Sequence, residues 1–239
     1  LDVETGVSKP LFRDGEYGYY PAWMPDGSGI VFLSRKANEP GQVWKMDLNN
    51  ENWTQLTWSK ISVSSFKMNP NGKGLVFMAR TPDTEKETDL KNRGYDFIFY
   101  EENLKNNNLY AVDFLDSGKS DIRQLTKGFN VWDFEINHSG THVAASISPK
   151  NLIDHRYMFR KINLIDLKTG NAKVVSNNEG KLGNYSFSMD DKKLAYTGAR
   201  DVNDHQVSQV FISDLEKGTV VNISKPTFKG HVSWASWKD

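Results

Sequence analysis

Short alternating apolar runs separated by tight turns dominate the chain. In PAWMPDGSGIVF (21–32), an aromatic run enters, Pro25-Asp26-Gly27 offers a turn, and an apolar run leaves. Pro25 presets φ, Asp26 can bond its own backbone, and Gly27 accepts a positive φ. The stretch therefore predicts a β-hairpin.

The same hairpin pattern recurs along the chain. The intervals between copies are about 45–50 residues, with one longer interval after the second copy. The further copies are MNPNGKGLVFMAR from Met68, INHSGTHVAASIS from Ile136, FSMDDKKLAYTGAR from Phe187 and a shortened WKD from Trp237.

Two more apolar runs follow each hairpin. The third run of each unit closes with Asp and a large apolar residue: QVWKMDL (42–48), NLYAVDF (108–114), KINLIDL (161–167) and QVFISDL (209–215). The fourth runs are TQLT (54–57), RQLT (123–126), KVVS (173–176) and VNIS (221–224). Four short strands in a meander at this period are typical of a propeller blade.

We therefore predict an all-β fold, a single β-propeller segment over residues 1–239. One four-stranded sheet cannot bury both of its faces, whereas blades stacked side by side can. The predicted full blades cover 19–57, 62–126, 131–176 and 183–224.

The two ends of the chain predict partial blades. Residues 1–12 resemble the end of a preceding blade, and residues 231–239 resemble the first strand of a next one. Together they lack a second strand. We therefore expect a fragment of a larger ring rather than a ring closed by a fifth, clasped blade.

The second blade carries an insertion, residues 81–107, between its second and third strands. Its first part is rich in charge, and we expect a charged loop there. Its second part, FIFYEENLKNN (97–107), predicts an aromatic and acidic strand. Helical patterns of any length are nearly absent from the chain.

Composition excludes several functional classes. The formal net charge is zero, so the basic excess of a nucleic-acid or anionic-membrane binder is missing. Cysteine is absent, which rules out disulfides, cysteine nucleophiles and thiolate metal sites. No apolar run approaches the ~20 residues of a membrane span, and the first residues lack the layout of a signal peptide.

Motifs of catalysis and of metal or nucleotide binding are also missing. The sequence contains no Gly-x-Ser-x-Gly, His-Glu-x-x-His or P-loop. Gly27-x-Gly29 and Gly72-x-Gly74 are hairpin turns, because no helix follows them. We interpret His138 and His142 as turn residues rather than metal ligands. The Asp that closes each third run is interpreted as a turn former: Asp47, Asp113, Asp166 and Asp214.

The insertion supplies the first candidate binding residues. Glu101 and Glu102 are adjacent acids beside Tyr100, and they can hold a cationic amine through charge-assisted hydrogen bonds. The alternative is a solvated hairpin end.

Two other loops contain candidates. In the equivalent loop one blade later, Arg156 can meet a carboxylate, with Tyr157 beside it; a plain surface loop is the alternative. The segment DVNDH (201–205) offers oxygens that suit Ca²⁺, but its spacing favours a polar turn. We expect no cofactor.

The repeats and three longer stretches carry a family resemblance. PAWMPDGSGIVFLSR and NYSFSMDDKKLAYTGA resemble TolB-type propeller repeats. The longer stretches resemble, in order, the N-terminal propeller of bacterial prolyl oligopeptidase-family serine peptidases, on the acylaminoacyl-peptidase and dipeptidyl-peptidase side. They are NNNLYAVDFLDSGKSDIRQLT, DHRYMFRKINLIDLKTGNAKVV and GKLGNYSFSMDDKKLAYTGARDVNDHQVSQVFISDL ending in GHVSWASW.

The resemblance implies a non-catalytic propeller. In that family a propeller of seven or eight blades caps an α/β-hydrolase domain, so the resemblance implies that this chain is a fragment of a seven- or eight-bladed ring. The hydrolase domain carries the Ser, Asp and His, and these residues match no position in this chain. The implied role is to gate and orient peptides for that domain, in the periplasm or outside a bacterial cell. Some family members hold the substrate's amino group with propeller acids, which Glu101 and Glu102 superficially resemble.

Two alternatives remain open from the sequence. One is a free-standing TolB-like propeller that binds a protein partner. The other is a glycan-active propeller, which needs carboxylates from several blades to converge on a central funnel. Whether the protein forms a homo-oligomer is also left open.

Overall fold

The second strand of each repeat is largely apolar on both faces because both faces are buried. The computed structural model describes residues 3–8, 10–12, 15–95, 97, 101–114, 120–203, 209–224, 227–228 and 230–238. In β2 (Gly29–Ser34), β6 (Gly74–Arg80), β10 (His142–Ser148) and β14 (Lys193–Gly198), nearly every central residue is buried. Such runs occur where a sheet is covered on both sides.

The described residues form four antiparallel sheets of four strands, each in the order of the sequence. The first strands are β1 (Tyr19–Trp23), β5 (Val63–Met68), β9 (Asn130–Ile136) and β13 (Leu182–Phe187). The third strands are β3 (Gln42–Asp47), β7 (Asn107–Phe114), β11 (Lys161–Asp166) and β15 (Gln209–Asp214). The fourth strands are β4 (Trp53–Gln55), β8 (Ser120–Gln124), β12 (Ala172–Val174) and β16 (Thr219–Asn222).

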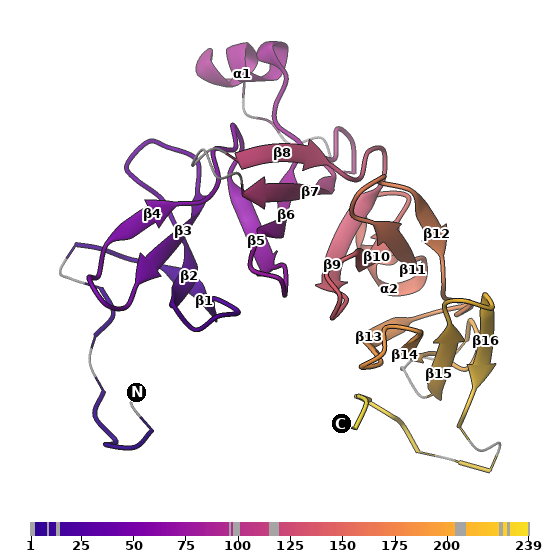
Figure 1. The fold of residues 1–239 in the computed structure, drawn as a ribbon. Coiled ribbons are helices and arrows are strands. Elements are labelled where there is room, and N and C mark those ends of the chain that lie inside the picture. The colour runs from indigo at the N-terminus through magenta and orange to yellow at the C-terminus, as the bar shows by residue number, and fades with distance from the viewer. Residues whose placement is uncertain are drawn as a thin grey trace.

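The four sheets follow one another along an open arc (Figure 1). The first strand of each sheet lies toward the concave side and the fourth toward the outside, and both chain ends lie on the open side. This arrangement is a segment of a β-propeller, and it confirms the predicted all-β fold. We call the sheets the first to fourth blades.

Each pair of neighbouring blades shares one hydrophobic cluster, to which alternate residues of a strand contribute. In β6, Leu75 and Phe77 join the cluster with the first blade, whereas Val76 joins the cluster with the third. In β10, Val143 faces the second blade and Ala144 the fourth. The period-two pattern thus builds both interfaces of a blade at once.

A hydroxyl just after each fourth strand completes the hydrogen bonding of the third strand. Thr57 Oγ1 accepts from Val43 N at 2.9 Å, and Thr126 Oγ1 accepts from Leu109 N at 2.9 Å. The other two bonds are Ile162 N to Ser176 Oγ at 2.9 Å and Val210 N to Ser224 Oγ at 2.8 Å. The last Thr or Ser of each predicted fourth run therefore pairs through its side chain rather than its backbone.

The Asp residues at the third-strand ends act mainly as turn formers, as predicted. Asp47 Oδ1 accepts from Asn49 N at 2.8 Å, Asp166 Oδ1 from Thr169 N at 2.7 Å, and Asp214 Oδ1 from Lys217 N at 2.9 Å. These bonds lower the pKa values of Asp166 and Asp214. Asp113 instead pairs with Arg123 at 3.3 Å.

The hairpin turns of adjacent blades also contact one another. Asp191 takes the left-handed position, at φ +57°, that Gly140 holds at φ +68° in the third blade. Its carboxylate accepts from the backbone N–H groups of His138 at 2.8 Å and Ser139 at 2.7 Å. On the other side of that turn, Asn69 Nδ2 donates to the carbonyl of Gly140 at 2.9 Å.

Two expected loops contain helices. The first part of the insertion forms α1 (Glu85–Asn92), not a charged loop, because Thr84 and Glu87 make a complete capping box. The loop with Arg156 and Tyr157 contains α2 (Ile153–Met158), whose acidic first turn and basic last turn suit the helix dipole.

The strand expected over 97–107 is replaced by a turn where it is described. Glu101 and Asn103 have left-handed φ values of +58° and +51°, which a strand cannot accommodate, and β7 starts only at Asn107. Residues 98–100, including Tyr100, lie outside the described residues.

The chain's own terminal segments contact the two end blades of the arc. Leu11 and Phe12 pack on Phe32, Trp44 and Met46 of the first blade. At the other end, Asn184 Nδ2 donates to the carbonyl of Ala235 at 2.8 Å, and Trp237 Nε1 donates to the carbonyl of Ser186 at 3.0 Å. Residues 231–238 thus lie along β13 without strand pairing of their own.

Candidate functional site

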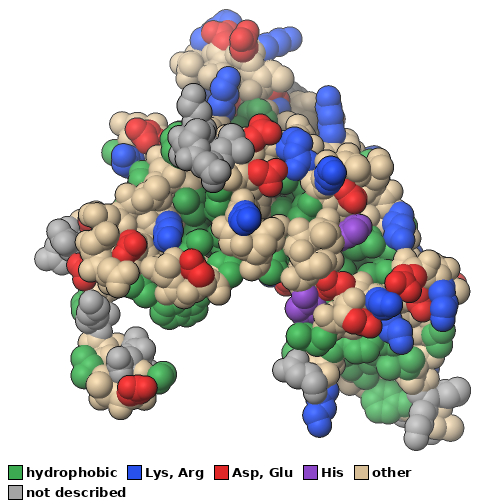
Figure 2. Space-filling view, in the orientation of Figure 1, with side chains coloured by type: hydrophobic (Ala, Val, Ile, Leu, Met, Phe, Trp, Pro, Cys, Tyr) green, Lys and Arg blue, Asp and Glu red, His purple; other side chains and the backbone are tan. Residues whose placement is uncertain are grey.

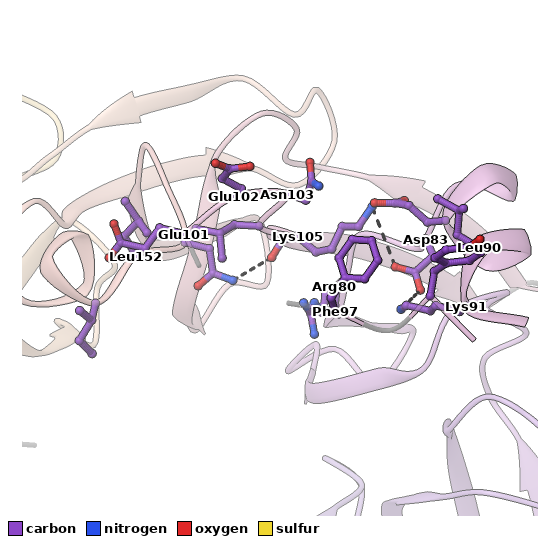
Figure 3. Close-up of a pocket in the computed structure, with 15 residues that line it drawn as sticks. Arg80, Asp83, Leu90, Lys91, Phe97, Glu101, Glu102, Asn103, Lys105 and Leu152 are labelled. Carbon is purple, nitrogen blue, oxygen red and sulfur yellow. Dashed lines mark hydrogen bonds and ion pairs between the residues drawn. The ribbon is translucent and has the colours of Figure 1, made fainter. Parts of the chain in front are cut away.

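A hollow of about 540 Å³ lies between connections of the second and third blades. In both blades these connections join the second strand to the third. One wall is α1 and the segment 101–105 of the second blade, and the other is residues 151–153 at the start of α2. Figure 3 shows this pocket, with the α1 side and Leu152 at opposite ends.

Helix α1 fixes the charged end of the pocket. Thr84 Oγ1 accepts from Glu87 N, and Glu87 Oε2 accepts from Thr84 N at 2.7 Å. Glu87 thereby points back to the helix start. There its Oε2 also accepts from Lys105 Nζ, at 2.5 Å.

The acids of this end are neutralised within the pocket. The Lys105 side chain is 15% exposed and lies 4.0 Å from Asp83 Oδ1, and Asp83 also pairs with Lys91. The hydrogen bond from Lys105, followed by the one from Thr84 N, lowers the pKa of Glu87 to about 2. Each of the two carboxylates therefore has a lysine partner.

Glu101 and Glu102 line the same pocket without such partners. Both side chains are exposed, and neither forms an ion pair with another described residue. Figure 3 places Glu101 toward Leu152 and Glu102 beside Asn103, away from Lys91. The pocket thus has paired charges at α1, a further cation in Arg80, and the two acids Glu101 and Glu102. It is partly walled by apolar Leu104, Leu152 and Ile153.

The structure separates the four residues predicted to bind substrate. Arg156 and Tyr157 lie on α2 but do not line the pocket. The Arg156 guanidinium lies 5.6 Å from the ring centroid of Trp132, and the Tyr157 side chain is 54% exposed. Arg156 and Tyr157 therefore lie outside the pocket that Glu101 and Glu102 line.

The other sequence candidates do not assemble into a site. His138 Nδ1 lies 2.9 Å from Asp191 Oδ1 at the contact between the third and fourth blades. Of DVNDH, residues 204–205 lie outside the described part, and Asn203 N donates to Asp201 Oδ1 in a turn. No group of His, Asp and Glu among the described residues is arranged to hold a metal ion.

Sequence reasoning missed Asp83, Glu87 and Lys105. The signal for the first two was present, because Thr84 followed three residues later by Glu87 is a capping-box sequence. Lys105 and Leu152 carry no such signal, since their role depends on which connections of adjacent blades meet.

Charges of both signs cover the surface. Figure 2 shows acidic and basic side chains interspersed over this view, with hydrophobic side chains more concentrated on the fourth blade. This mixture agrees with the zero net charge. Within the described part of the chain, no helix has the length and apolar character needed to cross a bilayer.

Comparisons with known proteins give the same fold. No protein-family model matches the sequence, and no curated protein matches it either. Among solved structures, TolB from Acinetobacter baumannii superposes with a TM-score of 0.55 at 17% identity, over 90% of this chain and 45% of that one.

Two further structures are similar to the chain. A putative TolB from Agrobacterium tumefaciens has a TM-score of 0.55 at 14% identity, over 91% of this chain and 65% of its own. A puromycin hydrolase has a TM-score of 0.55 at 14% identity, over 87% of this chain and 31% of its own. The chain thus spans less than two thirds of each of these proteins, and the likeness establishes a propeller fold.

Proposed function

We propose that this chain is a non-catalytic propeller segment that binds short peptides and orients them for an α/β-hydrolase domain. The observation that carries the proposal is the pair Glu101 and Glu102, which has no ion-pair partner among the described residues, at a pocket whose other acids, Asp83 and Glu87, are paired with lysines. A free carboxylate pair beside apolar side chains suits the amino terminus of a peptide and its first side chain.

The fold likeness supports this proposal in part. The chain is similar both to TolB and to a puromycin hydrolase, a protein whose name states a hydrolytic activity. Serine hydrolysis needs a nucleophile, a base and an oxyanion hole, and the sequence carries no nucleophile motif. In the proposed parent protein, the propeller selects and positions the substrate, and the bond is broken in the partner domain.

A TolB-like role is the second candidate. Two of the similar structures are TolB proteins, and each superposes over at least 90% of this chain. In that case the chain binds a folded protein, and a free amino terminus does not raise the affinity of a short peptide.

Calorimetric titration of a tripeptide such as Ala-Leu-Leu separates the two candidates. The free peptide should bind. Its N-acetylated form should bind about two- to fivefold more weakly, because acetylation removes the positive charge of the amino terminus. Glu101→Gln and Glu102→Gln should each weaken binding of the free peptide alone. Glu39→Gln, an exposed acid on the first blade, is the matched control and should change nothing.

Equal binding of the free and acetylated peptides, or an equal effect of all three variants, contradicts the amine-binding role. Absence of peptide binding together with capture of a folded protein supports the TolB-like role.

A further inference from the structure

One position of the repeat differs in the third blade. At the centre of strands two and three, three blades place a cross-strand pair of aromatic residues, whereas the third blade has Ala145 opposite Asn163. The aromatic pairs are Phe32 with Trp44, Phe77 with Tyr110, and Tyr196 with Phe211.

In the second and fourth blades, the aromatic pair packs in the cluster shared with the preceding blade. Phe77 and Tyr110 stack with ring centroids 5.0 Å apart and 12° between planes, and Tyr196 and Phe211 stack at 5.1 Å and 10°. In the second blade, Phe77 is buried in the cluster shared with the first blade, and Tyr110 packs against the same cluster together with Leu56. The corresponding residue after the second blade's fourth strand is Leu125.

Where the third blade lacks the aromatic pair, a groove of about 410 Å³ opens between the second and third blades. Leu125 forms one wall, and Ile147, Asn163 and Ile165 form the other. The opening lies at Asn163, which is partly exposed and lines the groove, whereas Ala145 is fully buried in the cluster shared with the second blade and does not line it. Space of this size is within the range of small-molecule sites.

Two aromatic rings flank the groove from its rim. Phe129, in the connection between the blades, is 53% exposed, and Phe159, just after α2, is 55% exposed. Large aromatic side chains exposed beside an apolar groove can contact an inserted ring by offset or edge-to-face packing.

The charge at the groove has one sign. Its charged lining residues are Lys127 and Lys161, and no acid lines it. Lys127 is exposed and forms no ion pair with a described residue, whereas Lys161 donates a hydrogen bond to the carbonyl of Asn178. Lys127 is thus available for an anion.

We propose that this groove binds a small aromatic carboxylic acid. The ring lies between Leu125 and Asn163, at the position where the third strands of the other blades carry an aromatic side chain, and the carboxylate pairs with Lys127. The site is separate from the peptide pocket and does not depend on its function.

The probe for the test is 3-phenylpropionate, titrated into the full chain and followed by calorimetry. We expect saturable binding. The matched ligands are 3-cyclohexylpropionate, which keeps the charge without an aromatic ring, and 3-phenylpropanol, which keeps the ring without the charge. Both should bind more weakly than the probe.

Three variants locate the site. Asn163→Phe restores the aromatic position of the other blades, and it should weaken binding about tenfold or more because the ring loses its burial. Lys127→Ala should weaken binding of the acid about two- to fivefold and leave the alcohol unchanged. Lys60→Ala removes an exposed lysine outside the groove and should change neither ligand.

Ala172→Trp is a second variant that narrows the groove, and it keeps the test valid if Asn163→Phe impairs folding. Ala172 lines the groove from the exposed edge strand β12, so a bulky side chain there narrows the groove without entering the core. It should also weaken binding. Unchanged binding in both Asn163→Phe and Ala172→Trp, or equal binding of the phenyl and cyclohexyl acids, overturns the proposal.

Discussion

The hydroxyl that ends each blade offers the sharpest test of how the repeat holds together. Thr57 is fully buried, accepts from Val43 N at 2.9 Å and donates to Gln42 Oε1 at 2.8 Å. Thr57→Val keeps the shape of the side chain and removes both bonds. Val43 is itself fully buried, so its N–H has no access to water in the folded state.

The expected loss follows from that unsatisfied donor. A buried polar group left without a partner costs about 1–3 kcal/mol. For a chain of this size each kcal/mol lowers the melting temperature by about 2–4 °C, so Thr57→Val should melt about 2–12 °C lower. Thr57→Ser keeps the acceptor and loses one methyl group, worth about 0.8 kcal/mol. Thr54→Val, at an exposed position of β4, is the control and should be near neutral.

Two assays separate the hydrogen bond from packing. Thermal or denaturant unfolding gives the free energy of each variant, and amide hydrogen exchange reports on Val43 N itself. The amide should exchange faster in Thr57→Val, and it should stay protected in Thr57→Ser. An unchanged exchange rate and melting temperature in Thr57→Val would refute the assigned role of the hydroxyl.

Three further predictions concern other contacts. The pKa of Glu87 is about 2 against an ordinary 4.5, so its bonds stabilise α1 fully above about pH 4.5 and are lost as pH falls toward 2. Lys105→Met should raise that pKa in a carboxyl NMR titration. Gly140→Ala should destabilise more than Gly27→Ala, because both have left-handed φ but only an added Cβ at 140 meets the Asn69 side chain; the difference between their unfolding free energies measures that clash. Asp191→Gly should lower the melting temperature although glycine suits the turn, since it deletes the bonds to His138 N and Ser139 N; an unchanged value contradicts the contact between blades.

The strands could be predicted because their pattern is local. The closing Asp of each third run, such as Asp47 and Asp166, and the alternation in runs such as 74–80 follow from the turn and sheet geometry of one blade. Helix α1 could have been predicted, since Thr84 and Glu87 have capping-box spacing. The scarcity of long helical patterns in the chain favoured a loop instead.

The site could be predicted only in part, because it forms between blades. Glu101 and Glu102 stand out as adjacent acids, whereas the pairing of Glu87 with Lys105 and the approach of Leu152 depend on how two connections meet. The exchange of an aromatic pair for Ala145 and Asn163 is visible in the aligned repeats. Its consequence, a groove, appears only when the neighbouring blade is in place.

Whether the pocket binds a free peptide without cleaving it is tested by a chemical-shift map of the isotope-labelled chain with the free tripeptide, followed by recovery of the peptide. We expect shifts in residues of α1, 101–105 and 151–153, and smaller shifts with the acetylated peptide. The peptide should be recovered intact. Shifts confined to other blades, or cleavage of the peptide that a serine-directed phosphonate abolishes, would contradict the proposed function.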